Sequence, residues 1–600
     1  MSQETSAQKR QPRGNRTEAV KTAAVVPDIS YVVSMPKPSN HLLQVEIRVK
    51  WAQLPDKTEL KMPVWTPGSY LVREYARHVQ DFTVKNAAGS GLPWSKTNKN
   101  TWQVETKGEK EIVVAYSVYA NELTVRTNEL NDEHAFWNNA ALLLFIKGQL
   151  AAPSLVRVQP FGNWKVATGL PPVAGQTNTF RAENYDILYD SPFEVSDYKE
   201  IKFTVLGKPH RYVVTGEGNY DLQRMADDTT KIIEEASKIF GDLPYNDYTF
   251  IVNLRGGGGL EHLNSTALQF NRWGFKPDSR YKSFLGLVAH EYFHVWNVKR
   301  IKPDVLGPFD YENENYTRLL WVAEGATAYY EGILMRRAGL ISDKEFLNTK
   351  VAQITQLQEK PGRLEMSLEE ASFDAWIKYY RPDENAINSQ VSYYDKGEIV
   401  NMLLDITIRT SSAGAKSLDD VMRYLYNEYA KKGRNYTPED FQKAAEMAAG
   451  KSLDEFFAKY VRGTDEIDYA SIFRGIGIEF GASNTGPGRS YIGANMADEA
   501  GRLMIRTVPA GTPAYEQGLN TGDQIVAVDG NRASLTFLSG YINERKPGDT
   551  VKLTVFRHDR LREIPFVLGE DDSPSYELST VAEPTPEQQK LYQQYLQAEL

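Results

Sequence analysis

The stretch "LVAHEYFHVWNVKR", residues 287–300, decides which fold class this chain belongs to. It places His290 and His294 four positions apart in an apolar run, with Glu291 directly after the first histidine. In a helix, positions i and i+4 lie on one face, so the two imidazoles can share one metal ion. Glu291 points about 100° around the helix axis from His290, and can therefore sit beside that ion without binding it.

Two helix-surface histidines with no ion between them are the alternative. The chain has only eight histidines among 600 residues. A pair with this spacing and this glutamate would arise by chance in about one such chain in a hundred. Phe284 and Leu285 precede the pair, Val295 and Trp296 follow it, and polar side chains buried in such a helix need partners. The pattern therefore favours a metal site, with Glu291 as the general base in zinc-dependent hydrolysis.

A catalytic zinc needs a third protein ligand. The chain contains no cysteine, so every ligand must be a histidine or a carboxylate. Glu324 lies in "WVAEGATAYYEG" (321–332), a helical pattern. A lone glutamate in a helix is usually solvated, but the apolar residues before it indicate a packed helix. Glu324 is therefore a candidate third ligand, which a second helix crossing the first could bring to the ion, and Glu331, two turns later, is a candidate partner of a ligating group.

Length and composition limit the classes of protein that the chain can belong to. Its 600 residues exceed what one hydrophobic core supports, so roughly two to four domains are expected. The hydrophobic and charged fractions, 41% and 24%, are those of a globular protein. A net charge of −9 argues against a nucleic-acid partner. No run approaches the roughly 18 consecutive apolar residues that a membrane span needs.

The first residues, "MSQETSAQKRQPRGNRTEAV", are polar and basic. They lack the apolar segment of a signal peptide. We expect residues 1–27 to form a disordered leader, and the protein to be soluble and cytoplasmic as the sequence is written. Removal of an export signal from the chain would instead mean a periplasmic or secreted protein.

Residues 28–205 have the pattern of strands. "QVEIRVKW" (44–51) alternates between apolar and polar side chains, and "EIVVAYSVYA" (111–120) is rich in β-branched and aromatic residues. An N-terminal domain resembling a β-sandwich is predicted. Residues 206–470 are mainly helical in pattern, with a strand at 248–254 and a first helix that ends at Gly241.

Two further segments complete a multidomain α+β protein. Residues 475–570 contain short strands around a brief helix, and residues 571–600 form a tail. In the tail, Thr585 as N-cap, Pro586 at the first helical position and Gln588 completing a capping box predict a short helix.

The motifs together resemble a known family. His-Glu-x-x-His followed by Trp-x-x-Glu-Gly is similar to the thermolysin-related zinc aminopeptidases, and "HEYFHVWNVKRIKP" with the C-terminal module resembles the glycyl aminopeptidase family over residues 28–570. The resemblance implies a thermolysin-like catalytic domain and one zinc ion per chain, held by His290, His294 and Glu324. Because Glu324 lies 30 positions after His294, more than in the aminopeptidase N relatives, residues 299–316 are expected to form an extra loop.

"RGGGGLEH" (255–262) is the candidate substrate-binding segment. It lacks the Gly-Lys-Ser/Thr of a phosphate-binding loop. A glycine run is often only a turn, but Gly258 and Gly259 would also let a peptide pair with an edge strand. Gly259 to His262 resembles the relatives' Gly-x-Met-Glu-Asn segment, with Leu for Met and His for Asn. The resemblance implies that Glu261 binds the free α-amine of the substrate, which would make the enzyme an exopeptidase.

"VSYYDKGEIVNMLL" (391–404) supplies the last predicted catalytic group. The segment resembles the relatives' motif around a tyrosine that donates its hydroxyl to the developing oxyanion. Tyr394 is the matching position, and Tyr393 is the competing choice. Both tyrosines could instead be core aromatic residues.

The C-terminal module resembles a PDZ domain of the bacterial type, on the basis of "AGTPAYEQGLNTGDQIVAVDG" (510–530). "YIGAN" (491–495) would be its carboxylate-binding loop, which could hold the C-terminus of a peptide. The groove could also pack only against the catalytic domain. The chain's own C-terminal Leu600 is a further candidate occupant.

The expected function is that of a zinc aminopeptidase that releases small N-terminal residues from peptides with a free N-terminus. The preference for Gly or Ala is implied by the resemblance alone. An endopeptidase is the alternative if Glu261 does not face the cleft. A catalytically inactive scaffold that binds peptides through its PDZ domain is the other alternative.

Overall fold

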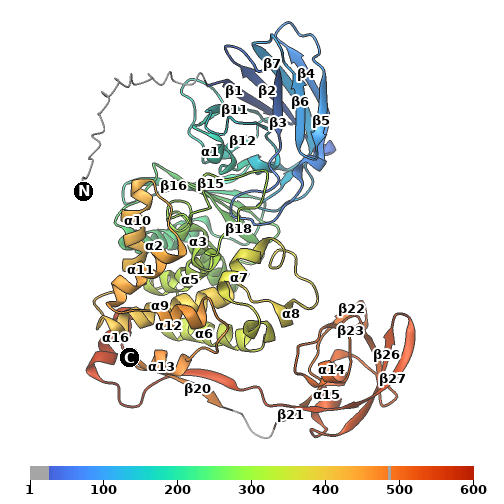
Figure 1. Ribbon diagram of the computed structural model, residues 1–600, viewed down its shortest axis with the longest axis vertical. Helices are drawn as coiled ribbons and strands as arrows, with labels where there is room; N and C mark the ends of the chain where they lie inside the picture. Colours follow the sequence, from blue (N-terminus) through green and yellow to red (C-terminus); the bar gives the residue numbers. More distant parts are fainter. Residues whose placement is uncertain (1–25, 484–487) are drawn as a thin grey trace, which may run out of the picture.

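The computed structural model describes residues 26–483 and 488–600, which form three bodies along the chain (Figure 1). A β domain comes first, a mainly helical domain follows, and a small β domain is attached to it by extended strands. This confirms the predicted multidomain α+β class. Nearly all of the expected leader, residues 1–25, lies outside the described residues.

The N-terminal domain consists of three sheets around one core. The six-stranded sheet has the order β13 (Thr179–Ala182), β11 (Ser154–Gln159), β1 (Asp28–Ser34), β2 (Leu42–Lys50), β7 (Glu111–Tyr119) and β4 (Val79–Asn86). The first four-stranded sheet contains β10 (Phe145–Ile146), β3 (Lys57–Lys61), β6 (Thr101–Glu105) and β5 (Trp94–Asn98). The second contains β12 (Lys165–Thr168), β14 (Phe193–Ser196), β9 (His134–Trp137) and β8 (Asn128–Leu130), and the short helix α1 (Tyr185–Tyr189) precedes β14.

The alternation of apolar and polar residues in β2 is matched by an alternation of buried and exposed side chains. Val45, Ile47 and Val49 are buried while the residues between them are exposed. Because successive side chains of a strand point to opposite faces, one face of β2 joins the domain core and the other faces solvent.

The helical domain has a five-stranded sheet at the face that meets the N-terminal domain (Figure 1). Its order is β15 (Lys199–Val205), β16 (Lys208–Thr215), β17 (Tyr248–Asn253), β19 (Ser265–Gln269) and β18 (Gly258–Glu261). Since β15 is hydrogen-bonded to β16 along its whole length, we place the boundary between the first two domains near residue 198, before β15 and not at 205. The glycine-rich segment forms β18 at the edge of this sheet, antiparallel to β19.

The helices form one large core beneath the sheet. The first, α2 (Leu222–Phe240), ends as predicted at Gly241, which has a left-handed φ of 85°. The others are α3 (Asp278–Phe293), α4 (Leu320–Ala323), α5 (Gly325–Arg337), α6 (Asp343–Gln358), α7 (Leu368–Phe373), α8 (Ala386–Ser389), α9 (Asp395–Ser411), α10 (Leu418–Glu428), α11 (Pro438–Ala449), α12 (Asp454–Tyr460) and α13 (Tyr469–Arg474).

Helix α5 packs between α3 and α9. Two glycines permit the contact of α5 with α9, because a Cβ on Gly325 would lie 2.7 Å from the Cα of Gly397. The residues between α3 and α4, which include the expected extra loop at 299–316, contain neither a helix nor a named strand. This packing brings the start of α9 next to the start of α5.

The small C-terminal domain is reached through two antiparallel strand pairs (Figure 1). These are β20 (Ile478–Ser483) with β29 (Ser575–Thr580), and β21 (Arg489–Tyr491) with β28 (Gly569–Asp571). The domain itself contains β22 (Asn495–Glu499), β23 (Arg502–Thr507), β24 (Gln524–Val528), β25 (Asn531–Arg532), β26 (Thr550–Arg557) and β27 (Arg560–Val567), with α14 (Pro513–Glu516) and α15 (Leu535–Asn543).

The predicted tail helix is present as α16 (Pro586–Leu596), with the capping box between Thr585 and Gln588. It returns to the helical domain, where Tyr595 and Leu596 are fully buried in the core. The small domain is therefore an excursion between α13 and α16, and the end of the chain belongs to the helical body. Within residues 26–483 and 488–600, no helix combines the length and the apolar character that crossing a membrane requires.

Candidate active site

Helix α3 and the junction of α4 with α5 bring the three predicted metal ligands together. His290 lies in the last turn of α3 and His294 directly follows its end. Glu324 Oε2 lies 3.6 Å from His290 Nε2 and 3.3 Å from His294 Nε2. Glu324 lies in a helical stretch, as the sequence pattern predicts, at the distorted junction of α4 with α5, where φ is −105° and ψ −47° while its N–H still donates to Leu320 and its carbonyl still accepts from Ala328.

These donor atoms have the spacing that a zinc ion requires. Zinc bonds to nitrogen and oxygen of about 2.0–2.1 Å at tetrahedral angles put neighbouring ligand atoms about 3.3 Å apart. The separations of Glu324 Oε2 from both imidazole nitrogens, 3.3 and 3.6 Å, agree with that value. Two imidazoles and one carboxylate also form the donor set of a catalytic zinc site that keeps a fourth position open.

Hydrogen bonds on the far side of each imidazole orient the ring. His294 Nδ1 lies 2.6 Å from the carbonyl oxygen of Asn297, to which it donates, so its Nε2 is free to face Glu324. His290 Nδ1 lies 3.5 Å from a carboxylate oxygen of Glu331, the partner that the sequence suggested. Asn297 was not predicted, although it is a polar residue in an otherwise apolar run. It is fully buried, and its amide also donates to the Val322 carbonyl, which ties α3 to α4.

The charges at the site act on one another because Glu291, His294 and Glu324 are buried and His290 is nearly so. Burial raises the pKa of the Glu291 carboxyl to about 7, although His290 and His294 act to lower it. Burial also acts to raise the pKa of Glu324, but His294 and His290 hold it well below its usual range. The two carboxyl groups therefore differ, with Glu324 ionised and Glu291 able to exchange a proton near neutral pH.

The edge strand β18 lies directly against Glu291. A Cβ on Gly259 would lie 2.2 Å from Glu291 Oε1, so only glycine lets the strand approach this closely. Glu261, on the same strand, is 3% exposed, and its oxygen falls within 4.8 Å of ligand atoms of Glu291 and His294. Glu261 therefore faces the metal-ligand group. The neighbouring His262 instead contacts Asp190, at 3.2 Å.

Two surrounding groups confine the Glu261 carboxylate. Lys299 Nζ lies 3.9 Å from Glu261 Oε1 and 2.6 Å from Asp190 Oδ1, so its charge is shared between the two acids. On another side, a turn of the N-terminal domain closes over the carboxylate. A Cβ on Gly68, which has a φ of 83°, would lie 2.7 Å from both oxygens of Glu261.

The two candidate tyrosines differ in their surroundings. Tyr394 directly precedes α9 and is only partly buried. The centroid of its ring lies 6.3 Å from that of the His290 ring. Tyr393 is fully buried, and its ring packs against Tyr379 with centroids 4.9 Å apart. Tyr394 thus lies beside a predicted metal ligand, whereas Tyr393 forms part of the core.

Comparisons with known proteins agree with this arrangement. Sequence models match the Peptidase M61 N-terminal domain at residues 30–197, the M61 glycyl aminopeptidase at 283–400 and a PDZ domain at 490–566. The crystal structure of an aminopeptidase N family protein from Idiomarina loihiensis is similar to the chain, with a TM-score of 0.88 and 31% identity. The match covers 94% of this chain and 100% of that chain. The chain belongs to the M61 glycyl aminopeptidase family.

As a member of this family, the protein is a zinc metallopeptidase. The three matched sequence models also confirm that an N-terminal, a catalytic and a PDZ domain are present. More distant solved structures include an M1 zinc metallopeptidase from Deinococcus radiodurans, at 13% identity and a TM-score of 0.48 over 74% of this chain and 94% of that chain. Yeast LTA4 hydrolase matches at 14% identity and a TM-score of 0.42, over 75% and 67%. No curated protein sequence matches the chain.

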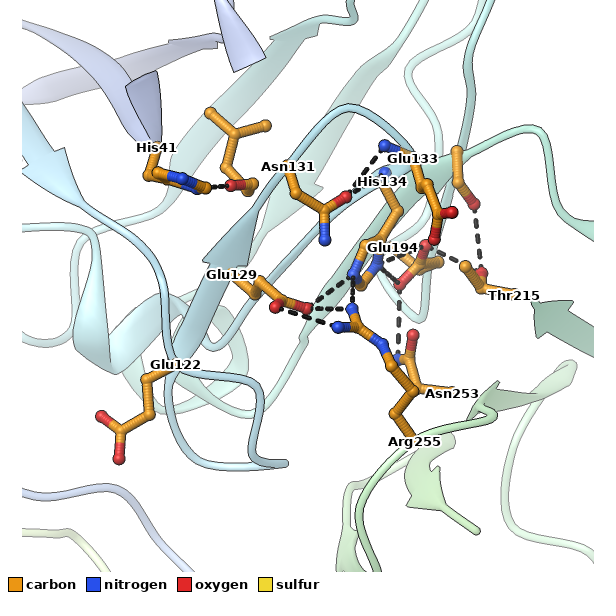
Figure 2. Close-up of polar contacts among 12 residues, drawn as sticks. His41, Glu122, Glu129, Asn131, Glu133, His134, Glu194, Thr215, Asn253 and Arg255 are labelled. Carbon is orange, nitrogen blue, oxygen red and sulfur yellow. Dashed lines mark hydrogen bonds and ion pairs between the residues drawn. The ribbon is translucent and has the colours of Figure 1, made fainter. Parts of the chain in front are cut away.

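In this M61 peptidase, a buried polar network anchors the start of the glycine-rich segment to the N-terminal domain (Figure 2). Arg255 Nη1 donates to Glu129 Oε1 at 3.3 Å, and His134 bridges Glu129 at 2.8 Å and Glu194 at 3.3 Å. From the catalytic sheet, Asn253 donates to Glu194 at 3.4 Å. Glu129, Glu194 and His134 are buried, and the half-exposed Arg255 adds a second basic side chain, so that two acidic and two basic groups balance each other's charge.

Proposed function

We propose that this M61 peptidase is an aminopeptidase that removes small N-terminal residues, glycine or alanine, from peptides and uses one zinc ion per chain. The observation that supports the proposal most strongly is the position of Glu261. Its buried carboxylate faces the group formed by Glu291 and His294. A carboxylate at that position binds a cationic α-amine one residue away from the bond to be cleaved.

The residues of the site divide the reaction between them. The edge of β18 pairs with the backbone of the substrate, and Glu261 binds its ammonium group. A zinc ion held by His290, His294 and Glu324 would supply a Lewis acid that polarises the scissile carbonyl and acidifies water. Glu291 accepts a proton from the attacking water and passes it to the leaving amine.

Tyr394 completes the set of groups that act on the scissile bond. Its hydroxyl donates to the oxygen on which negative charge develops, while Tyr393 keeps the neighbouring core packed. The closeness of Gly68 to Glu261 supports a preference for a small first residue. The turn around Gly68 leaves no room for even one methyl group on that side of the amine-binding carboxylate.

Glu291→Gln tests the mechanism. The variant should keep its zinc, because Glu291 is not among the three ligands, and its turnover should fall by about 10²–10⁴-fold because it cannot accept a proton. Zinc content and kcat are measured on the same preparation. A variant that cleaves as fast as the wild type would show that Glu291 is not the base.

Acetylated substrates test the exopeptidase assignment. Ala-Ala should be hydrolysed and acetyl-Ala-Ala should not, because acetylation removes the positive charge that Glu261 binds. A protein that cleaves both equally would be an endopeptidase, the alternative within the same fold. A protein that contains zinc and cleaves neither would support an inactive scaffold.

The PDZ domain contains a groove for a second peptide. A cavity of about 660 Å³ lies between the "YIGAN" loop and α15, where Leu538 and Ile542 line it, and Lys360 of the catalytic domain lies at its rim. We infer that this groove binds a peptide C-terminus. Leu600 does not occupy it, since its side chain packs beside Gly477 on the helical domain. Fluorescence anisotropy with labelled peptides that end in a free or an amidated C-terminus tests this binding, and equal affinities would contradict it.

A further inference from the structure

Two arginines of the N-terminal domain, Arg73 and Arg126, lie close enough for their charges to interact, and Arg126 reaches the active site. Among the described residues, neither forms an ion pair, and the Nε of each is buried without a hydrogen-bond partner, although Arg73 Nη2 donates to Ser69 Oγ at 3.0 Å. The two positive charges also act on each other, since Arg126 lowers the pKa of Arg73, after the larger effect of burial. Nearby carboxylates act on both charges, Glu122 on Arg73 and Glu291 with Glu261 on Arg126, but none of them pairs directly with a guanidinium, so each guanidinium keeps donors for an anionic ligand.

Arg126 reaches the substrate-binding strand. Its Nη2 donates to the carbonyl oxygen of Gly259 at 3.5 Å, which is at the long limit for a hydrogen bond. Gly259 is the residue that lies against Glu291. The groups that surround the Arg126 charge are two phenols and two carboxylates: Tyr380, Tyr394, Glu291 and Glu261. The guanidinium therefore lies within the active site itself.

The position of Arg126 is fixed by its neighbours. Val125 is fully buried in a cluster with Ile251 and Leu260 of the catalytic sheet, so the loop between β7 and β8 is fastened to β17 and β18. The Arg126 carbonyl accepts a hydrogen bond from Tyr75 Oη at 2.8 Å. A long side chain that is held at its root in this way loses less entropy when it binds a ligand than a free surface arginine does.

The order of the charges along β18 points to a particular ligand. Glu261 is the proposed site of the substrate amine, and Gly259 beside Glu291 marks the scissile carbonyl. Arg126 contacts the strand at the carbonyl of Gly259, two residues before Glu261 along β18. In a dipeptide, the terminal carboxylate follows the scissile bond by a single residue, about 3.5 Å of extended chain. The guanidinium group matches a carboxylate in geometry as well as in charge.

We propose that Arg126, with Arg73 behind it, binds the C-terminal carboxylate of short peptides, so that dipeptides with two free ends are the preferred substrates. The inference rests on the proposed aminopeptidase function, because Glu261 must hold the amine for the carboxylate to reach Arg126. Arg126 is then a specificity-determining residue that acts on the part of the substrate that leaves.

A comparison of Ala-Ala with its amide, Ala-Ala-NH₂, tests the proposal with the full-length enzyme. Both substrates have the same amine and the same scissile bond, and only one has the carboxylate. We expect wild-type kcat/KM to be higher for the free acid by about tenfold or more, and Arg126→Gln to reduce kcat/KM for the acid by about 10- to 100-fold. For the amide, Arg126→Gln should reduce kcat/KM clearly less than for the acid, because only the long 3.5 Å contact with the Gly259 carbonyl is lost. The kcat/KM of Arg126→Lys for the free acid should lie between those of the wild type and Arg126→Gln, because lysine keeps the charge and loses the paired donors.

Arg48→Gln is the matched control. Arg48 lies in the same domain, but it is exposed and paired with Glu111. Its replacement also removes one positive charge, but away from the cleft, and kcat/KM should not change for either substrate. An equal loss on acid and amide in Arg126→Gln would mean that Arg126 only positions Gly259, and it would overturn the proposal. Equal wild-type kcat/KM values for Ala-Ala and Ala-Ala-NH₂ would overturn the proposal even without a variant. If the wild type cleaved neither dipeptide but cleaved acetylated longer peptides, the aminopeptidase assignment would fail instead.

Discussion

A single methyl group at Gly259 should stop turnover without unfolding the protein or releasing its metal. The backbone of Gly259 lies so close to the proposed base that a Cβ would be 2.2 Å from Glu291 Oε1 and 2.4 Å from its Cδ. Carbon and oxygen atoms that are not bonded keep about 3.4 Å or more between them. In Gly259→Ala, Glu291 or β18 must therefore move by more than about 1 Å.

The size of the effect follows from that displacement. A shift of about 1 Å in a catalytic group costs on the order of 10²-fold in rate. The proton transfer that Glu291 performs is worth about 10²–10⁴-fold. We expect kcat to fall by about 10²- to 10³-fold, with unchanged zinc content because the three proposed ligands come from α3 and the α4–α5 junction and not from β18.

Gly257→Ala is the control in the same segment. A Cβ on Gly257 would have no neighbour within 4 Å, and its φ is not left-handed, so an alanine fits there. Gly258 cannot serve, because its φ of 102° would strain any other residue. The assay is hydrolysis of Ala-Ala by both variants, with zinc analysis and circular dichroism of the same samples. A Gly259→Ala enzyme within threefold of the wild type would refute the placement of Glu291 against β18.

Three further changes test other parts of the site. Tyr394→Phe should lower kcat by about 10²–10³-fold because an oxyanion donor is lost, whereas Tyr393→Phe should mainly lower stability. Equal losses of kcat in the two variants would contradict the assignment of Tyr394. Removal of zinc by a chelator should abolish hydrolysis and lower the melting temperature, and added zinc should restore both. The bound metal should stabilise the fold by about 4 kcal/mol when free zinc is at 1,000 times its Kd. An enzyme that stayed active after chelation would exclude a role for the metal. Burial acts to lower the pKa of His134, but Glu194 and Glu129 raise it to about 9. Since that folded-state pKa lies above the ordinary 6.5, the stabilisation, on the order of 3 kcal/mol, should be present below pH 6.5 and be lost as the pH rises through 9. Melting curves of wild type and His134→Gln from pH 6 to 10 should show a smaller pH dependence in the variant, and parallel curves would contradict this prediction.

The metal-binding group was predictable because its information is local. His290 and His294 belong to a single helical turn, so spacing alone places them on one face. The end of α2 at Gly241 and the capping box of α16 were predictable for the same reason, since each depends on residues within a few positions. Glu324 needed the family resemblance, because no spacing rule links it to a helix 30 positions away.

The features that sequence could not supply depend on contacts between distant segments. The position of Glu324 beside α3 is one of them, since Asn297 binds the carbonyl groups of Val322 and Ala323. Strand β15 has the same alternating residues as the strands before it, and only its pairing with β16 assigns it to the catalytic sheet. The return of α16 to the helical core is likewise a tertiary contact with no sequence signature.

The N-terminal domain is part of the active site, and its contacts with β18 support this conclusion. The segment that contains β18 is held at its start by Arg255, which binds Glu129 of the first domain. At the other end of β18, Gly68 of the first domain lies against Glu261. Between these two points, Arg126 donates to Gly259. Since an edge strand has no second neighbour to hold it straight, these contacts support β18 on either side of the position where the substrate is proposed to pair. An isolated catalytic domain would keep its zinc ligands, which all come from α3 and the α4–α5 junction, and would lose the support that aligns the peptide with them.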